Sequence, residues 1–220
     1  MTPLVTLGIP FYNCERTLAD AIRSIFAQTF GNWELILADD GSTDGSLSMA
    51  RGVGDPRVRV LSDARNRGLP TRLNQIARSA RGVYVARMDA DDLSHPARLA
   101  RQATFLEQHP EVDVVGTGTY SVDERGRPTG KRGASPMQLS TEAMLRCGGL
   151  LHPTVMGRRS WFLLNPYDAR RLRAQDRELW CRTASNSSFA HVVDPLYFYC
   201  EHRSFSLKKY AQSKAVARTV

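Results

Sequence analysis

The sequence predicts an α/β fold with a Rossmann-like, mostly parallel central sheet and helices on both faces of that sheet. Short apolar runs alternate with segments of helical periodicity over residues 1–116, and the links between them are short. In addition, turns rich in carboxylates follow two of these runs directly. In parallel sheets, such turns meet at the edge where ligands bind.

The first elements follow from hydrophobic periodicity. Residues 4–9 (LVTLGI) predict a buried strand, which we expect Pro10 to end. The apolar positions within residues 15–28 recur with helical spacing and predict an amphipathic helix. Residues 33–38 (WELILA) predict a second strand, which runs straight into a polar turn at 39–44 (DDGSTD) and a helix start.

The alternation continues beyond this turn. We expect a short strand over 58–61, a helix that Gly82 closes, a strand over 83–86, a helix over 96–108 and a strand over 112–115. After residue 116 the pattern changes. There we expect a polar hairpin or loop over 119–132, an apolar strand through Met156, helices over 137–147 and 175–183, and one or two strands over 189–200.

Residues 83–98 (VYVARMDADDLSHPAR) carry the strongest chemical signal. The apolar run ends in a turn that contains Asp89, Asp91 and Asp92. Three carboxylates repel one another, and a fold keeps them together where a cation shares their charge. Hard oxygen ligands suit Mg²⁺ or Mn²⁺, which usually bind phosphates as well. The alternative is an acidic turn that caps the helix beginning near Pro96.

Polar clusters at three strand ends indicate one binding site. Residues 10–13, 39–44 and 89–92 each follow an apolar run. The carboxyl ends of parallel strands lie at the same edge of a sheet, so we expect the three clusters to converge on one crevice. The alternative is three independent turns.

Composition narrows the class of protein. A chain of 220 residues with 42% hydrophobic and 24% charged residues is long enough for one globular domain with a sizeable core. The net charge of +8 suits nucleic acid, anionic lipid or phosphorylated substrates, and because no nucleic-acid-binding motif occurs, we expect no nucleic-acid partner. We expect a cytoplasmic protein, since no signal peptide or membrane span is evident. The scattered cysteines are expected to be reduced thiols; they are Cys14, Cys147, Cys181 and Cys200.

At this point the chain resembles the family 2 glycosyltransferases, inverting enzymes with the GT-A fold. The resemblance covers residues 4–206 and rests on six short motifs in the same order. They are IPFYN at 9–13, ADDGSTDGS at 38–46, NRGLPTRLN at 66–74, MDADD at 88–92, HPTVM at 152–156 and QDRELW at 175–180. The resemblance implies a single domain over 1–220, with a nucleotide-sugar-binding half (1–116), an acceptor-side part (117–206) and a basic tail (207–220).

The resemblance also implies a donor site, at Pro10, Tyr12, Asp40, Arg67, Asp89, Ala90 and Asp91. Tyr12 would stack on the nucleotide base, and Asp40 would accept a hydrogen bond from a pyrimidine imide N–H, which favours a UDP- or dTDP-sugar as donor. Guanine offers the same kind of N–H, so a GDP-sugar is the main competitor. Arg67 would contact the diphosphate. Asp91 would bind the divalent ion, Mn²⁺ or Mg²⁺, with His202 as a further ligand.

For the reaction, the resemblance implies displacement at the anomeric carbon with inversion. Asp176 would be the base that deprotonates the acceptor hydroxyl, although this chain has Gln175 where the family usually has Glu. His152 and Trp180 would lie on the acceptor side, and a hydrogen-bonded structural role for His152 stays open. The acceptor would be a glycan, a lipid-linked sugar or another hydroxyl compound.

Alternatives remain at this stage. A sugar nucleotidyltransferase would share the sheet and the metal but needs a Gly-rich basic loop after the first strand, which IPFYN lacks. A non-catalytic sugar-nucleotide-binding module would keep Asp40 and Asp91 but would need no base. The basic tail leaves open a surface helix, a disordered segment or peripheral contact with the inner face of a membrane.

Overall fold

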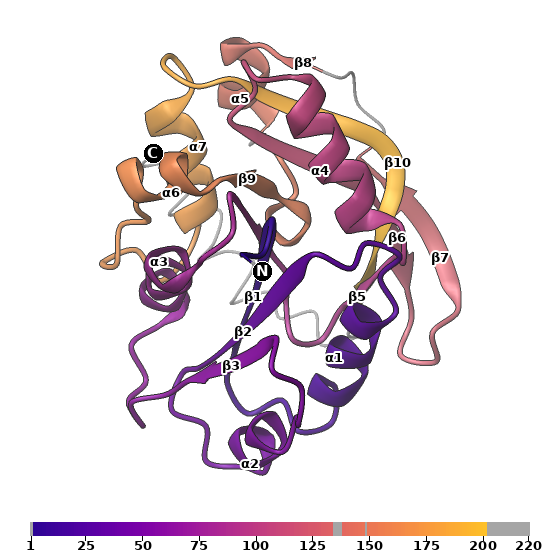
Figure 1. Cartoon of the computed structure of the whole chain (residues 1–220). Coiled ribbons are helices and arrows are strands. Elements are labelled where there is room, and N and C mark those ends of the chain that lie inside the picture. Colours follow the sequence, from indigo (N-terminus) through magenta and orange to yellow (C-terminus); the bar gives the residue numbers. More distant parts are fainter. Residues whose placement is uncertain (1, 134–137, 148, 202–220) are drawn as a thin grey trace.

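The computed structural model describes residues 2–133, 138–147 and 149–201, and these form one mixed sheet with helices on both faces (Figure 1). The strand order is β3-β2-β1-β4-β9-β6-β10-β5, with β7 beside β6 and β8 beside β10. The predicted α/β fold is therefore confirmed.

The first half of the sheet is parallel, as the sequence predicts. It contains β1 (Val5–Phe11), β2 (Trp33–Asp39), β3 (Val58–Leu61) and β4 (Tyr84–Arg87), and β1 lies between β2 and β4. Every residue of β1, β2 and β4 is buried. Their apolar side chains pack on both faces, which explains why these strands read as continuous apolar runs instead of alternating ones.

The second half of the sheet is mixed. The short strand β9 (Met156–Arg158) lies between β4 and β6 (Val114–Val122) and is antiparallel to both. The long strand β10 (Phe189–Cys200) then runs parallel to β6. The remaining short strands pair antiparallel with these; they are β5 (Leu93–Ser94), β7 (Pro128–Arg132) and β8 (Gln138–Leu139).

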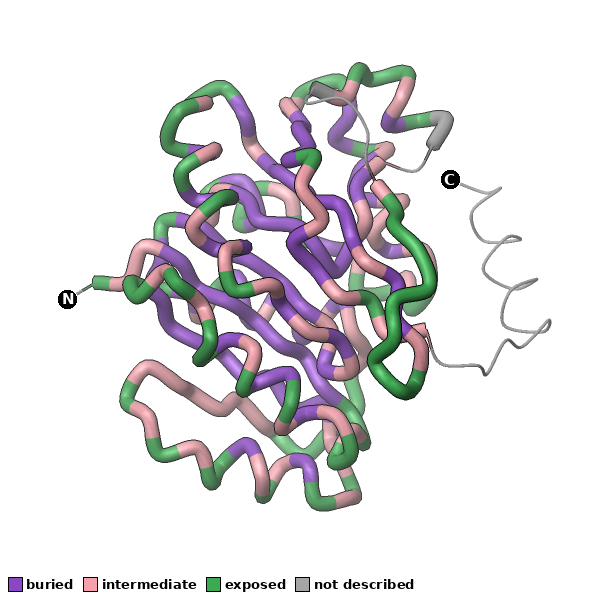
Figure 2. The backbone as a smooth tube through the Cα atoms, turned by 90° about the vertical axis from the view of Figure 1, so that its right-hand side faces the viewer, coloured by how far each residue is buried: buried purple, intermediate pink, exposed green. Residues whose placement is uncertain are grey.

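Helices cover both faces of the sheet, and the buried residues are concentrated in its central strands (Figure 2). The buried apolar side chains form two clusters. The first cluster includes α1 (Leu18–Phe26), α2 (Ser46–Arg51) and α4 (Arg98–Gln108). The second includes α3 (Leu69–Ser79), α5 (Thr141–Cys147), α6 (Arg159–Leu164) and α7 (Gln175–Thr183). A 3₁₀ turn spans His152–Thr154. No helix in the described ranges is long and apolar enough to cross a membrane.

Pro10 does not end the first strand, contrary to the prediction. It lies inside β1 and is in register with Ala38 of β2. The backbone nitrogen of Pro10 lies on the edge of β1 that faces β4. The pairing of β1 with β4 ends at Gly8 and Arg87. Because no strand lies opposite Pro10 there, its missing N–H costs no ladder hydrogen bond.

Two other boundaries also differ from the predicted ones. The helix α3 ends before Ala80, which is already extended, so Gly82 does not close it. A Cβ atom on Gly82 would lie 2.6 Å from the backbone nitrogen of Thr6, so this glycine permits close approach of two strands. The strand predicted over 112–115 extends to Val122 and forms a hairpin with β7, as one of the two readings of residues 119–132 anticipated.

Candidate functional site

A cleft of about 1060 Å³ opens at the carboxyl ends of β1 and β4. Each predicted polar cluster contributes to its lining: residues 10–13 at the end of β1, Asp44 after β2, and residues 89–92 after β4. The opposite wall comes from the β6–β7 hairpin, with Asp123 and Glu124, and from the end of β10. The cleft is large enough for a nucleotide-sized ligand.

The acidic turn after β4 divides its carboxylates between different tasks. Asp89 forms an ion pair with Arg87, and Asp92 accepts hydrogen bonds from the Tyr197 hydroxyl (2.8 Å) and the Cys200 backbone N–H (2.8 Å). Asp91 lines the cleft. The helix α4 has no side-chain cap, so the alternative of an acidic capping turn has no support here.

Burial raises the proton affinity of this turn. The pKa of Asp92 rises to about 7 because burial penalises its charge. The hydrogen bond from the Cys200 N–H opposes this rise, and the charges of Asp89 and Asp91 add to it. Burial also raises the pKa of Asp89, with Arg87 opposing that rise. Closely spaced carboxylates with raised pKa values gain from a bound cation, so the turn fits a divalent ion chemically.

A buried polar layer supports the turn from below, and the sequence reasoning missed it. Arg98 is fully buried beside the Tyr197 ring and donates to the backbone carbonyl of Arg87 (2.7 Å). The Tyr197 hydroxyl also accepts the Asp89 backbone N–H (3.1 Å). Arg87 gave a signal that could have been used, since a charged residue at the end of an apolar strand requires a partner. Tyr197 gave none, because it lies in an aromatic strand more than one hundred residues away.

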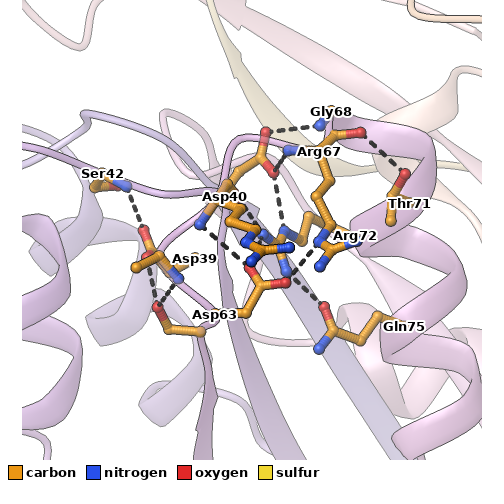
Figure 3. A network of polar contacts seen from close by, with 12 residues as sticks. Asp39, Asp40, Ser42, Asp63, Arg67, Gly68, Thr71, Arg72 and Gln75 are labelled. Atoms are coloured by element: carbon orange, nitrogen blue, oxygen red, sulfur yellow. Dashed lines mark hydrogen bonds and ion pairs between the residues drawn. The ribbon is translucent and has the colours of Figure 1, made fainter.

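Asp40 lies outside this cleft lining, in a network at the start of α3 (Figure 3). Its carboxylate accepts the backbone N–H groups of Arg67 (2.8 Å) and Gly68 (3.0 Å) and pairs with Arg72 (2.9 Å). The Arg67 guanidinium pairs with Asp63. Asp40 therefore fixes the turn before α3, and its role towards a nucleotide base stays a prediction.

The other predicted donor residues lie in the cleft. Pro10 and Ala90 are buried and form part of its lining, and Tyr12 is half exposed there. A half-exposed aromatic ring at the cleft wall is available for stacking on a planar ligand. The structure thus brings Pro10, Tyr12, Asp89, Ala90 and Asp91 together, and it places Asp40 and Arg67 to one side.

Asp176 lies on the first turn of α7, within electrostatic range of the acidic turn. Burial raises the pKa of Asp89, and the charge of Asp176 adds to that rise. Burial likewise raises the pKa of the Tyr167 hydroxyl, with smaller contributions from both carboxylates. The preceding residue, Gln175, is buried. The C-terminal part of the chain therefore brings a carboxylate towards the end of β4.

The two predicted acceptor-side residues are buried. His152 hydrogen bonds with the Tyr167 hydroxyl (2.9 Å), and its pKa lies well below the usual range because it is buried near Arg87. Its neutral, hydrogen-bonded ring fits the structural alternative. Trp180 has no exposed surface and stacks on Trp161, so its ring packs inside the core, and its place on the acceptor side stays a prediction.

The residues present fit a divalent ion that a ligand helps to hold. Within the described ranges, no group of three or more His, Cys, Asp or Glu side chains forms a ready metal cage. Mg²⁺ and Mn²⁺ sites often use one or two carboxylates together with substrate phosphates, and Asp91 at the cleft suits that arrangement. The other predicted ligand, His202, lies outside the described residues.

Comparisons with known proteins agree with the fold and show the family. The family model "Glycosyl transferase family 2" matches residues 6–189. A putative glycosyltransferase, EpsE of Bacillus subtilis, is 41% identical over 188 residues, which are 82% of this chain and 66% of EpsE. The Escherichia coli protein WfgD, a UDP-Glc:α-D-GlcNAc-diphosphoundecaprenol β-1,3-glucosyltransferase, is 26% identical over 189 residues, or 86% of this chain and 73% of WfgD.

Solved structures show the same fold. TarS of S. aureus (residues 1–349), crystallised in complex with UDP-GlcNAc, superimposes with a TM-score of 0.77 at 17% identity, covering 98% of this chain and 65% of that one. The chain spans just under two thirds of the length of EpsE and of this TarS chain. The family model covers most of the chain, and this chain therefore belongs to glycosyl transferase family 2.

Proposed function

We propose that this chain is an inverting glycosyltransferase that moves a sugar from a nucleoside-diphosphate donor to an acceptor hydroxyl, in polysaccharide or glycoconjugate synthesis. One observation carries the proposal: the cleft at the ends of β1 and β4 holds an acidic turn, and Asp176 approaches that turn from α7. Family membership and the named activity of WfgD support it.

The donor would lie in the cleft with its base near Tyr12 and its diphosphate near Asp91. The donor is expected to be a UDP- or dTDP-sugar. TarS structures with UDP and with UDP-GlcNAc support this choice of nucleotide. The cleft lining is strongly acidic, so a bare diphosphate would be repelled there. A divalent cation, Mn²⁺ or Mg²⁺, bound by Asp91 would neutralise the diphosphate and stabilise it as the leaving group.

The acceptor would approach from the α7 side. Its hydroxyl oxygen forms the new bond to the anomeric carbon, while the bond from that carbon to the diphosphate oxygen breaks and its electron pair leaves with the diphosphate. The acceptor proton passes to Asp176, which acts as general base. Attack from the side opposite the leaving group inverts the anomeric configuration.

The test is the variant Asp176→Asn. Asn is nearly isosteric with Asp but cannot take up a proton, so transfer should fall by a factor of about 10² to 10⁴. Donor affinity should be unchanged, because the donor contacts come from residues before 100. Release of UDP from a panel of UDP-sugars with hydroxyl acceptors reports the rate, and calorimetry with UDP and Mn²⁺ reports the affinity.

Glu178→Gln is the matched control. Glu178 lies on the same helix and pairs with Arg182 at the surface, so its loss should leave the rate within about twofold. A wild-type rate for Asp176→Asn would overturn the mechanism. A larger thermal shift with GDP than with UDP or dTDP would show that the predicted nucleotide base is wrong. It would not contradict the proposed type of reaction. Pyrophosphate-dependent exchange would instead favour the nucleotidyltransferase alternative.

A further inference from the structure

Residues 163–173 form an unusually exposed stretch, here called the 163–173 segment. Leu164 and Leu172 are 81% and 67% exposed, the two highest values among the large hydrophobic residues described as exposed, and Leu163 is 41% exposed. Water-facing leucines on the same short segment are costly unless something else covers them. The segment joins α6 to α7 and lies beside α3 (Figure 1).

The segment is fixed to the body of the protein by its buried residue. Tyr167 exchanges two backbone hydrogen bonds with the side chain of Asn74 on α3, at 2.8 and 2.9 Å. Arg182 on α7 donates to the carbonyl of Pro166 (2.8 Å). A Cβ atom on Gly68 would lie 2.7 Å from Leu172, so this side chain leans on the start of α3. These contacts hold the backbone of the segment in place while its leucine side chains stay exposed.

The same segment is basic. It carries Arg170, Arg171 and Arg173 against a single carboxylate, Asp168. Asp168 is taken by Arg170, which lowers its pKa to about 2 and keeps it ionised. The guanidinium of Arg173 is exposed and has no hydrogen bond or ion pair with any described residue. Exposed leucines thus share one surface with three arginines that outnumber its single carboxylate.

We propose that the 163–173 segment docks on the surface of an anionic lipid bilayer. The arginines would lie among lipid phosphates, and the leucines would enter the interface, where their exposure to water ends. Nucleic acid would engage the arginines but not the leucines, and a neutral bilayer would engage the leucines alone. Charge and apolar surface together favour the anionic bilayer.

The place of the segment gives the docking a consequence. Asp176 follows Arg173 by three residues, at the start of α7. A docked segment would hold this carboxylate close to the membrane surface. Resting on the function proposed above, the acceptor hydroxyl would then belong to a lipid-linked sugar at that surface. The docking itself does not depend on catalysis and is tested without it.

The test is co-flotation of the full chain with vesicles of phosphatidylcholine, with and without phosphatidylglycerol. The wild-type chain should float only with the anionic vesicles, and less so in high salt. The triple variant Arg170→Gln/Arg171→Gln/Arg173→Gln should lower partitioning about 100-fold, since each arginine near such a surface contributes about fivefold. Leu164→Ser/Leu172→Ser should lower it at least about tenfold.

Matched variants elsewhere control for net charge and surface hydrophobicity. Arg51→Gln/Arg81→Gln/Arg125→Gln removes the same charge from exposed arginines on other parts of the surface, and Leu145→Ser/Val193→Ser removes apolar surface outside the segment. Both should float like the wild type. These side chains are exposed except for the half-buried Arg171, so melting temperatures should change little.

Two outcomes would overturn the proposal. The first is that the wild-type chain does not float, or that both segment variants float as well as it does. The second is that light scattering shows a wild-type dimer which Leu164→Ser/Leu172→Ser converts to a monomer, because the leucines would then be covered by a second copy of this chain. Failure of the function proposed above would leave the flotation results unaffected, and failure of flotation would leave the transfer assay unaffected.

Discussion

Two arginine-centred regions at the ends of the parallel strands differ in how completely they are satisfied. At the start of α3, Arg72 is 1% exposed and contacts Asp40, Asp63 and Gln75 as well as a backbone carbonyl (Figure 3). At the end of β4, Arg87 pairs with Asp89, but its buried Nε has no partner among the described residues. A buried Nη1 of Arg98 beneath it also has none.

The difference separates a region that holds the fold from one that binds. Buried polar groups are normally hydrogen-bonded, and exceptions tend to occur at functional sites. The Arg72 region meets that rule and keeps the loop before α3 in place. The end of β4 is an exception to that rule, because the buried Arg87 Nε and Arg98 Nη1 have no partner among the described residues. The carboxylates of Asp89 and Asp92 in the same region have raised pKa values. Substitutions in the first region should therefore reduce stability, and substitutions in the second should reduce ligand binding.

The largest effect is expected for Arg72→Met. This change leaves the buried Asp40 carboxylate without its counter-ion, which typically costs about 3 to 5 kcal/mol of unfolding free energy. Urea denaturation measures the loss. Arg23→Met, which breaks an exposed pair with Asp20, should cost less than about 0.5 kcal/mol. Equal losses for the two variants would show that the Arg72 region is not a structural anchor.

Next comes Asp91→Asn, which should leave stability intact and weaken binding. Losing one ligand charge should lower the Mn²⁺-supported affinity for UDP at least about tenfold, judged from the effects of altering metal-site shells. Calorimetry with and without Mn²⁺ measures this effect. Asp20→Asn, which removes an exposed carboxylate that pairs with Arg23 in the same cleft lining, is the control and should bind normally. If wild-type affinity for UDP is the same with and without Mn²⁺, the metal has no part in binding.

Tyr197→Phe tests whether the buried polar layer beneath the acidic turn, a region assigned to ligand binding, also contributes to stability. The hydroxyl accepts from the Asp89 N–H and donates to Asp92. Its removal leaves the Asp89 N–H without its acceptor and one Asp92 oxygen without its donor, which should cost about 1 to 2 kcal/mol. Tyr199→Phe on the same strand, with its part-exposed ring, should cost little. A Tyr197→Phe protein as stable as the wild type would mean that the turn is held without this hydroxyl.

The smallest effect concerns acid stability. Arg72 lowers the pKa of Asp63 to about 2, below its ordinary value near 3.8. The ionised form of Asp63 is therefore favoured in the folded state, and its contribution is present above the ordinary pKa and is lost as pH falls towards 2. Asp63→Asn should flatten the fall in melting temperature between about pH 4 and pH 2. An unchanged slope would assign acid sensitivity to other carboxylates.

Most of the parallel half could be predicted from the sequence. The run 33–38 and the carboxylates after it gave β2 and its turn, and the apolar run before Asp89 gave β4, because buried parallel strands leave an uninterrupted apolar pattern. The mixed half was harder to predict. The three-residue strand β9 is too short to carry a pattern, and the antiparallel pairing it makes with β4 and β6 depends on contacts far apart in sequence.

The sequence by itself determined the alternation of strands and helices and the carboxylates that follow the strands, since both are local patterns with local physical causes. The tertiary structure alone decided which carboxylate does what. Asp92 is held by Tyr197 and Cys200, Asp89 by Arg87, and Asp40 by Arg72. Asp89, Asp91 and Asp92 line the cleft, and Asp40 does not. It also buried Trp180 and His152. Burial and pairing arise from residues brought together across the chain, so no local pattern could have given them.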